Sequence, residues 1–451
     1  MKASFYTLGC KLNQMETEAL ASSFRGQGFL IVKSNENADL FLLNSCTVTS
    51  KSDQKSRKWL RRVSRENPEA LVIATGCYAQ LDPEILKSTG KNVVVIDQHK
   101  KDLLLDFPLF IRETEGIAKF KNLKFNEKVR LFSQFLESNS GHREDRFRYE
   151  INSYYFHSRA FLKIQDGCDY NCTYCRIPLA RGPSVSLNSG HIVNHIKELE
   201  KNGYREVVFT GVNIASYSSE GCDFKCLLKK ILSSNVSIRM RISSLEPEKI
   251  DRELANILSD PRICSHFHIP VQSGSNRILK LMKRRYNRDR IYSSVAMLRE
   301  TKENPFIAAD IIAGFPGEGV NDFMDSYNLL DELAFSRLHV FPYSPRPGTE
   351  AVFFKNRVPE RERDERVHSL LKLSEKLFLN YAALWEGKEA EIVVESMDNS
   401  GISGITSNYL PVKVNKSTGK PWPETVKQRS LVRVKILKAG EICEGELINS
   451  R

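Results

Sequence analysis

Between residues 160 and 345, short apolar runs alternate with helical patterns, and this alternation constrains the fold more than any other feature of the sequence. Strand-like runs lie near residues 161–164, 207–210, 238–242, 266–270, 307–312 and 338–341. Helical spacing separates them, for example over residues 192–201, 249–258 and 323–333. Six such βα units predict a curved parallel sheet, like a TIM barrel that lacks two units, with functional groups at the carboxyl ends of the strands.

The first of these runs leads into three closely spaced cysteines, the central trio. Cys168, Cys172 and Cys175 form the pattern C-x3-C-x2-C in QDGCDYNCTYC. Three thiolates on one loop suit three irons of a cubic [4Fe-4S] cluster, which usually takes four cysteines. The missing fourth ligand leaves one iron open to a small molecule. The pattern therefore predicts a cluster that takes part in a reaction rather than one that only transfers electrons.

Structural zinc is the main alternative for this triplet. Zinc usually takes four protein ligands, and no fourth Cys or His stands nearby at matching spacing. A disulfide is a weaker alternative still, because ten cysteines in 451 residues are too sparse for a disulfide scaffold.

Three further cysteines, the N-terminal trio, hold equivalent positions in a smaller α/β layer predicted over residues 1–97. Cys10, Cys46 and Cys77 each follow a predicted strand, in TLGC, LLNSC and ATGC. The carboxyl ends of parallel strands lie side by side, so the three thiols are expected to meet and to hold a second cluster. Gly9 and Gly76 allow the backbone a close approach. The alternative is three separate buried cysteines, since free cysteine is often buried.

The remaining segments complete a four-part organisation. Residues 98–158 carry charge clusters and predict a helical linker. The central domain is expected over 159–386 and ends in a charged amphipathic helix at 359–385. Beyond Gly387, short alternating β runs separated by turn residues predict a small antiparallel barrel over 387–451.

Composition limits the cellular setting and the partners. No apolar run reaches about 18 residues, and the N-terminus lacks the apolar core of a signal peptide. The sparse cysteines favour a reducing cytoplasm, where thiols stay free for metal. The net charge of +12 favours a polyanionic partner such as RNA. Basic residues are frequent in the predicted barrel: Lys413, Lys416, Lys420, Lys427, Arg429, Arg433, Lys435 and Lys438. Another group crowds one central segment: Arg277, Lys280, Lys283, Arg284, Arg285, Arg288 and Arg290.

Eight segments are similar to the motifs of one enzyme family. They are FYTLGCKLNQMETE, LFLLNSCTVT, ATGCYAQ, KIQDGCDYNCTYCRIPLARG, RISSLEPE, FHIPVQSGS, DIIAGFPGE and HVFPYSPRPGT. C-x3-C-x2-C is the signature of radical S-adenosylmethionine (SAM) enzymes, and the full set resembles the methylthiotransferases. The resemblance extends over nearly the whole chain, with a C-terminal barrel similar to the TRAM domain. It is greatest to the branch that modifies tRNA carrying N6-threonylcarbamoyladenosine (t6A) at position 37.

The resemblance implies a cytoplasmic transferase that adds a methylthio group to C2 of t6A in the tRNA anticodon loop. One [4Fe-4S] cluster, on the N-terminal trio, holds the sulfur that one SAM methylates. A second, on the central trio, binds another SAM and takes an electron from an external donor to generate a radical. C2 is an unactivated position, so the cofactors carry the chemistry and no catalytic side chain is implied. Neither DNA nor a membrane is an implied partner.

The resemblance also implies a SAM pocket. Its cofactor-binding positions are Tyr174, Gly211, Glu246, Gln272, Ser273, Gly314 and Gly317. Tyr174 matches the aromatic position that lies against adenine. Asp310 is a candidate ligand contact, and Arg181 and Arg346 are candidate contacts with tRNA or SAM.

Three other functions stay open at this point. Related enzymes act on isopentenyladenosine in tRNA or on an aspartate of a ribosomal protein. A non-catalytic iron–sulfur RNA-binding protein is a candidate from another class. Val185 and residues 214–217 depart from the family pattern, which leaves fine substrate preference open. Cys222, Cys226, Cys264 and Cys443 match no ligand motif.

Overall fold

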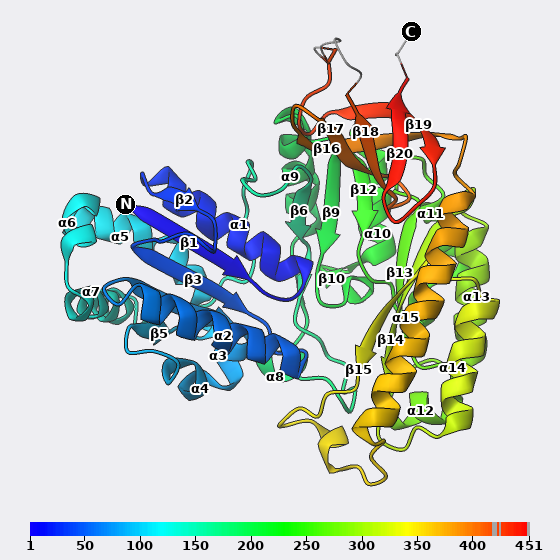
Figure 1. The fold of residues 1–451 in the computed structure, drawn as a ribbon. Coiled ribbons are helices and arrows are strands. Elements are labelled where there is room, and N and C mark those ends of the chain that lie inside the picture. Colours follow the sequence, from blue (N-terminus) through cyan, green and yellow to red (C-terminus); the bar gives the residue numbers. More distant parts are fainter. Residues whose placement is uncertain (417–421, 424, 449–451) are drawn as a thin grey trace.

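The computed structural model describes residues 1–416, 422–423 and 425–448. An N-terminal α/β layer lies beside a larger central partial barrel, and a small β-barrel covers one end of that partial barrel (Figure 1). Within the described residues, no helix has the length and apolar character needed to cross a membrane.

The N-terminal layer is built on a fully parallel five-stranded sheet with the order β2-β1-β3-β4-β5. The strands are β1 (Lys2–Thr7), β2 (Leu30–Val32), β3 (Leu40–Ser45), β4 (Leu71–Gly76) and β5 (Val93–Val95). Helices α1 (Lys11–Gly26), α2 (Ser50–Glu66), α3 (Cys77–Leu81) and α4 (Pro83–Lys87) connect them. Strands β3 and β4 are buried along their whole length, as expected for parallel strands covered on both faces.

A helical segment follows the sheet over residues 98–138, and residues 139–158 continue to β6 (Ala160–Lys163) without a helix. It contains η1 (Gln98–Leu105), α5 (Phe107–Thr114), α6 (Ile117–Asn122) and α7 (Phe125–Ser138). Lys101, Tyr149 and Tyr154 are buried, so residues 98–158 form part of the core rather than a solvated spacer.

The central domain is the predicted partial (β/α)6 barrel. Two parallel sheets, β12-β9-β6 and β13-β14-β15, are joined by single bridges between Met240 and Ile263 and between Ser244 and His268. The strands are β6 (Ala160–Lys163), β9 (Glu206–Thr210), β12 (Arg239–Ile242), β13 (His266–Gln272), β14 (Phe306–Ala313) and β15 (Arg337–Pro342). The covering helices are α9 (Ser189–Lys201), α10 (Phe224–Ser233), α11 (Arg252–Leu258), α12 (Asn276–Leu281), α13 (Arg288–Arg299), α14 (Val320–Glu332) and α15 (Glu360–Ala383).

The C-terminal domain is a closed barrel with the strand order β16-β17-β18-β20-β19, as predicted. Its strands are β16 (Glu389–Met397), β17 (Gly401–Thr406), β18 (Pro411–Asn415), β19 (Leu431–Lys438) and β20 (Cys443–Leu447). The pairings are antiparallel except that β18 and β20 run parallel. Lys420, one of the basic residues predicted here, lies outside the described residues.

A buried ion cluster fastens this barrel to the amino ends of the central strands. Glu206, at the start of β9, is fully buried and accepts hydrogen bonds from Arg239 and Arg241 at 2.7 Å each. Arg241 also donates to the backbone carbonyls of Thr406 and Ser407 at 3.0 Å each. Burial opposes the charge on Glu206, but the two arginines hold the pKa of its carboxyl below the usual value. The docking therefore depends on an ionised carboxylate.

We expect Glu206→Gln to lower the free energy of unfolding at pH 7 by about 3 kcal/mol, because it leaves two buried guanidinium groups unpaired. The folded-state pKa of Glu206 lies below its unfolded value of 4.5, so its stabilisation is complete above about pH 5 and is lost as pH falls. The variant should therefore lose less stability than the parent between pH 5 and pH 3. Urea unfolding at pH 7, 5 and 3 measures both effects, with Glu253→Gln, which changes an exposed ion pair, as control.

Candidate cluster sites and the cavity between them

The N-terminal trio lies along one edge of the five-stranded sheet. Cys10 precedes α1, Cys46 follows β3, and Cys77 opens α3 directly after β4. A Cβ on Gly9, whose φ is +103°, would lie 2.6 Å from Cβ and 2.8 Å from Sγ of Cys46. Only glycine allows the backbone beside Cys10 to approach Cys46 this closely. The strand ends therefore bring the cysteine positions together, as the rule for parallel sheets predicts.

Burial and the neighbouring thiols both affect Cys46. Burial, together with the adjacent Cys77 and Cys10, raises the pKa of the Cys46 thiol to about 12. Without metal, the Cys46 thiol is therefore protonated at neutral pH. Binding of metal at this position must release its proton.

The central trio lies on the loop between β7 (Gln165–Asp166) and α8 (Ile177–Arg181). Each sulfur accepts one hydrogen bond. The Tyr170 and Ile177 backbone N–H groups donate to Cys168 and Cys175 at 3.4 Å each, and Arg284 Nη1 donates to Cys172 at 3.2 Å. Hydrogen bonds to the sulfur ligands help to set the reduction potential of an iron–sulfur cluster. The sequence motif does not reveal Arg284, which is 112 residues from Cys172.

The donor chemistry fits clusters better than a single ion. Six cysteines in two groups provide soft sulfur ligands, the type that iron–sulfur centres require. Within the described part of the chain, no three His, Cys, Asp or Glu side chains gather as ligands of one metal ion would. Ligands of a cubic cluster each bind a different iron, so the two trios suit clusters by their donor type.

A cavity of about 180 Å³ lies where the loop after Cys46 meets the central trio. Residues from both halves of the molecule line it: Thr47, Val48, Thr49, Tyr174, Cys175, Arg176, Ile177, Gln272, Asp310, Ile312, Phe341, Pro342, Tyr343 and Ser344. Thr47 is the residue after Cys46, and Cys175 belongs to the central trio. A small planar ligand in this cavity would lie beside Cys175 and beside the loop that follows Cys46.

Two buried arginines hold the walls of this cavity together. Arg176 donates to Thr47 Oγ1 at 3.2 Å and to Asp82 Oδ2 at 3.0 Å. Arg346 donates to Thr47 Oγ1 at 2.6 Å and to Asp53 Oδ2 at 2.5 Å. Arg346, a candidate contact for tRNA or SAM in the sequence, is thus buried and paired within the protein. Both arginines tie the central domain to the loop after Cys46.

The predicted SAM-pocket residues fall into two groups. Tyr174 and Gln272 line the cavity, and Gln272 has a positive φ of +59°. Glu246 lies behind the central trio, where Arg284 donates to both its carboxylate and Cys172. Burial, with smaller contributions from Glu248 and Asp310, outweighs the nearby Arg284 and raises the pKa of Glu246 to about 7. Asp310 also lines the cavity and contacts His268 at 2.8 Å.

The other predicted pocket residues contact protein rather than the cavity. A Cβ on Gly211 would lie 2.7 Å from the Ile214 side chain. Ser273 is fully buried, and its hydroxyl lies 3.3 Å from Ser326 Oγ. Gly314 and Gly317 have φ of +76° and +86° and form turns. Their roles toward SAM stay predictions.

Most of the basic segment at residues 277–290 has partners within the protein. Arg277, Lys283, Arg284 and Arg288 pair with Asp322, Glu350, Glu246 and Asp325. Arg290 donates to the carbonyls of Pro247, Glu248 and Ile250. These contacts account for much of the charge without a phosphate partner. Cys222 and Cys226, which matched no ligand motif, form a disulfide.

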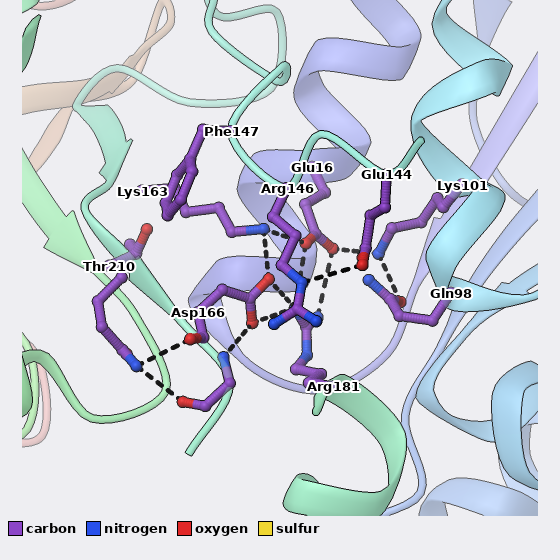
Figure 2. A network of polar contacts seen from close by, with 12 residues as sticks. Glu16, Gln98, Lys101, Glu144, Arg146, Phe147, Lys163, Asp166, Arg181 and Thr210 are labelled. Carbon is purple, nitrogen blue, oxygen red and sulfur yellow. Dashed lines mark hydrogen bonds and ion pairs between the residues drawn. The ribbon is translucent and has the colours of Figure 1, made fainter. Parts of the chain in front are cut away.

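Behind the N-terminal trio, charged side chains from both domains form a buried network (Figure 2). Arg181 Nη1 of α8 donates to Glu16 of α1 at 3.1 Å and to both oxygens of Asp166 at 3.0 Å. Lys163 contacts Glu16 at 3.1 Å and Asp166 at 2.6 Å, and Lys101 pairs with Glu16. Despite burial, these cations lower the pKa of Asp166 to about 2 and that of Glu16 well below its usual value. Arg181, also a candidate tRNA or SAM contact in the sequence, belongs to this network.

The fold and the two trios together define a radical SAM enzyme with an additional N-terminal cysteine domain. The model of the Radical SAM superfamily matches residues 162–330, and that of the uncharacterized protein family UPF0004 matches residues 2–97. A solved radical S-adenosylmethionine methyltransferase, TsrM from Kitasatospora setae, has a similar fold, with a TM-score of 0.53 and 14% identity over 78% of this chain and 76% of that chain.

Full-length relatives narrow the class. The chain is 36% identical to "Threonylcarbamoyladenosine tRNA methylthiotransferase MtaB" of Treponema pallidum, over 97% of this chain and 98% of the relative. It is also 36% identical to the Bacillus subtilis protein of the same name, over 97% and 94%. A "tRNA-2-methylthio-N(6)-dimethylallyladenosine synthase" of Endomicrobium trichonymphae is 32% identical over 89% and 90%. The chain belongs to the radical SAM methylthiotransferase family.

In the metal-free protein, we expect iodoacetamide to modify Cys10 faster than Cys46. Burial raises the pKa of both thiols, so the difference rests on access: Cys10 is exposed, whereas Cys46 is 5% exposed. Peptide mass spectrometry of anaerobically alkylated protein measures both rates, with the buried Cys264 as a slow reference. Equal rates at Cys10 and Cys46 would contradict the described arrangement of the N-terminal edge.

Proposed function

We propose that this chain is a tRNA methylthiotransferase that converts t6A at position 37 to its 2-methylthio form. The observation that carries the proposal is the cavity that the central trio shares with the loop after Cys46, in a chain whose full-length relatives bear the name of this activity. A nucleobase in that cavity would lie between the two places where the reaction's components must be held.

The residues that would hold the clusters are the two trios: Cys10, Cys46 and Cys77 for one, and Cys168, Cys172 and Cys175 for the other. When bound, the central cluster with SAM supplies hydrogen abstraction from C2, and the N-terminal cluster supplies the sulfur that is methylated and transferred. The Tyr170 and Ile177 N–H groups and the Arg284 guanidinium would stabilise the negative charge on the central thiolates.

The protein's own contribution is positioning and exclusion of water. Tyr174 and Phe341 offer aromatic surfaces to a planar base, and Gln272 and Asp310 offer polar groups to its edge or to SAM. Arg176 and Arg346 fix the distance between the walls through Thr47. When cofactors carry out the chemistry, the main contribution of the protein is to hold the reacting groups at a fixed distance and orientation.

Substrate and electrons reach the cavity from outside. The C-terminal barrel carries exposed basic side chains, including Lys413 and Lys435, that suit tRNA phosphates. An external one-electron donor completes the proposed set of partners. The related dimethylallyladenosine synthases make isopentenyladenosine in tRNA the second candidate substrate.

A nucleoside profile tests the substrate. We expect cells that lack this gene to lose 2-methylthio-t6A from total tRNA while t6A itself persists, as measured by liquid chromatography and mass spectrometry. Loss of the 2-methylthio form of isopentenyladenosine would identify the second candidate instead. An unchanged profile of both nucleosides would reject the proposal.

Cysteine variants test the separate roles proposed for the two trios. We expect anaerobically reconstituted Cys46→Ala to bind about half the parent's iron and still to form 5′-deoxyadenosine with dithionite, yet to yield no methylthiolated product. Cys172→Ala should lose both activities. Cys443→Ala, a buried cysteine of the C-terminal barrel, is the control and should match the parent. Full iron content in Cys46→Ala would remove the N-terminal trio from the proposal.

A further inference from the structure

We propose that Arg181, through its buried ion network, positions the N-terminal trio and supplies the positive charge that stabilises the cluster held there. This inference rests on the proposed function, because it takes the N-terminal trio as a cluster site. It assigns a role in one cysteine domain to a residue that belongs to the other.

The first argument is geometric and runs through Asn13. Arg181 Nη2 donates to Asn13 Oδ1 at 2.6 Å. The Asn13 amide nitrogen in turn donates to the Leu8 carbonyl at 2.8 Å and to the Ser45 carbonyl at 3.1 Å. Leu8 lies two residues before Cys10, and Ser45 immediately precedes Cys46. Asn13 therefore clamps two of the three cysteine-bearing strand ends, and Arg181 fixes the orientation of its amide.

The third strand end is tied to the same clamp. The Ser45 hydroxyl donates to the Thr75 carbonyl at 2.5 Å and accepts a hydrogen bond from the Ala79 N–H at 3.2 Å. Cys77 lies between Thr75 and Ala79. A displacement of Asn13 would thus be transmitted to the positions of Cys10, Cys46 and Cys77 alike.

The second argument is the charge balance of the network. Three cations, Lys101, Lys163 and Arg181, share two carboxylates, Glu16 and Asp166, and all five side chains are at most 2% exposed. Nearby, Asp102 contacts His142 at 2.8 Å and Glu144 pairs with Arg146. Among the five side chains of the network itself, cations therefore outnumber carboxylates by one. A cubic cluster on three thiolates carries net negative charge, which this excess would balance.

The excess charge is directed toward the trio by Arg181 in particular. Arg181 Nη2 and the Cys10 thiol both donate to Asn13 Oδ1, at 2.6 Å and 3.9 Å. Lys101 and Lys163 contact the carboxylates instead. Arg181 also lies six positions after Cys175 on the same continuous segment. The loop that carries the central trio therefore leads directly into the residue that supports the other trio.

The chain offers a matched pair of variants. Arg181→Met and Lys101→Met each leave two cations facing two carboxylates, so they remove the same buried charge. Only Arg181→Met also removes the bond to Asn13 and the charge beside the trio. Arg181→Lys keeps the charge but cannot place two nitrogens on Glu16, Asp166 and Asn13 at once.

The test uses full-length protein in which Cys168, Cys172 and Cys175 are replaced by alanine, so that any iron belongs to the N-terminal trio. After anaerobic reconstitution, we expect iron loss to a chelator to be about tenfold or more faster in Arg181→Met than in Lys101→Met, the size typical of groups that support metal ligands. Redox titration should give a more negative midpoint potential in Arg181→Met than in the other two variants, since a nearby positive charge stabilises the reduced cluster.

The outcomes separate this inference from the proposed function. If the three-alanine parent binds no cluster, the N-terminal trio is not a cluster site and the proposed function fails. If it binds a cluster but Arg181→Met and Lys101→Met match in iron loss and in potential, the role of Arg181 is wrong. If Arg181→Met does not fold by circular dichroism, Arg181→Lys replaces it: iron loss faster than in Lys101→Met supports the inference, and equal iron loss overturns it.

Discussion

The arrangement of the whole molecule depends on one buried carboxylate. Glu16 of α1 accepts contacts from Lys101 of η1, Lys163 of β6 and Arg181 of α8, so three separate segments meet at a single side chain. A buried carboxylate without partners is costly, which makes any arrangement that separates these segments unfavourable. The network (Figure 2) thereby fixes α1 against β6. The cysteine-bearing strand ends of the N-terminal sheet are held with it against the central partial barrel.

Much of this design follows from the sequence because it depends on strand periodicity. Parallel strands order their carboxyl ends along one edge, so cysteines placed just after β1, β3 and β4 meet without any knowledge of side-chain contacts. The same rule places the central trio after β6. The partial barrel of six βα units and the closed C-terminal barrel were predictable in the same way, from the period of the apolar runs and the turn residues between them.

The supporting residues were not predictable, because they act over long sequence separations. Arg284 reaches Cys172 from α12's C-terminal side, and Arg346 reaches Thr47 across 299 residues. In the sequence, Arg181 and Arg346 are isolated arginines, and a surface or ligand role is the ordinary expectation for that residue type. Their burial arises only when two domains are packed together. Likewise, the glycines of GFPG form turns whose role toward SAM cannot be read from their spacing.

The two trios occupy different domains, and this separation has a physical consequence for the cavity. A wall built from one sheet alone would move with that sheet, whereas this cavity takes Thr47 from one domain and Tyr174 and Gln272 from the other. Its width therefore depends on the contacts between domains, which Arg176, Arg346 and the Glu16 network provide with buried ion pairs. Ion pairs of this kind add little net stability but penalise every other geometry, because a misplaced partner leaves a charge unpaired. Buried ion pairs between the domains, and not apolar contacts alone, thus fix the distance between the two cysteine sites.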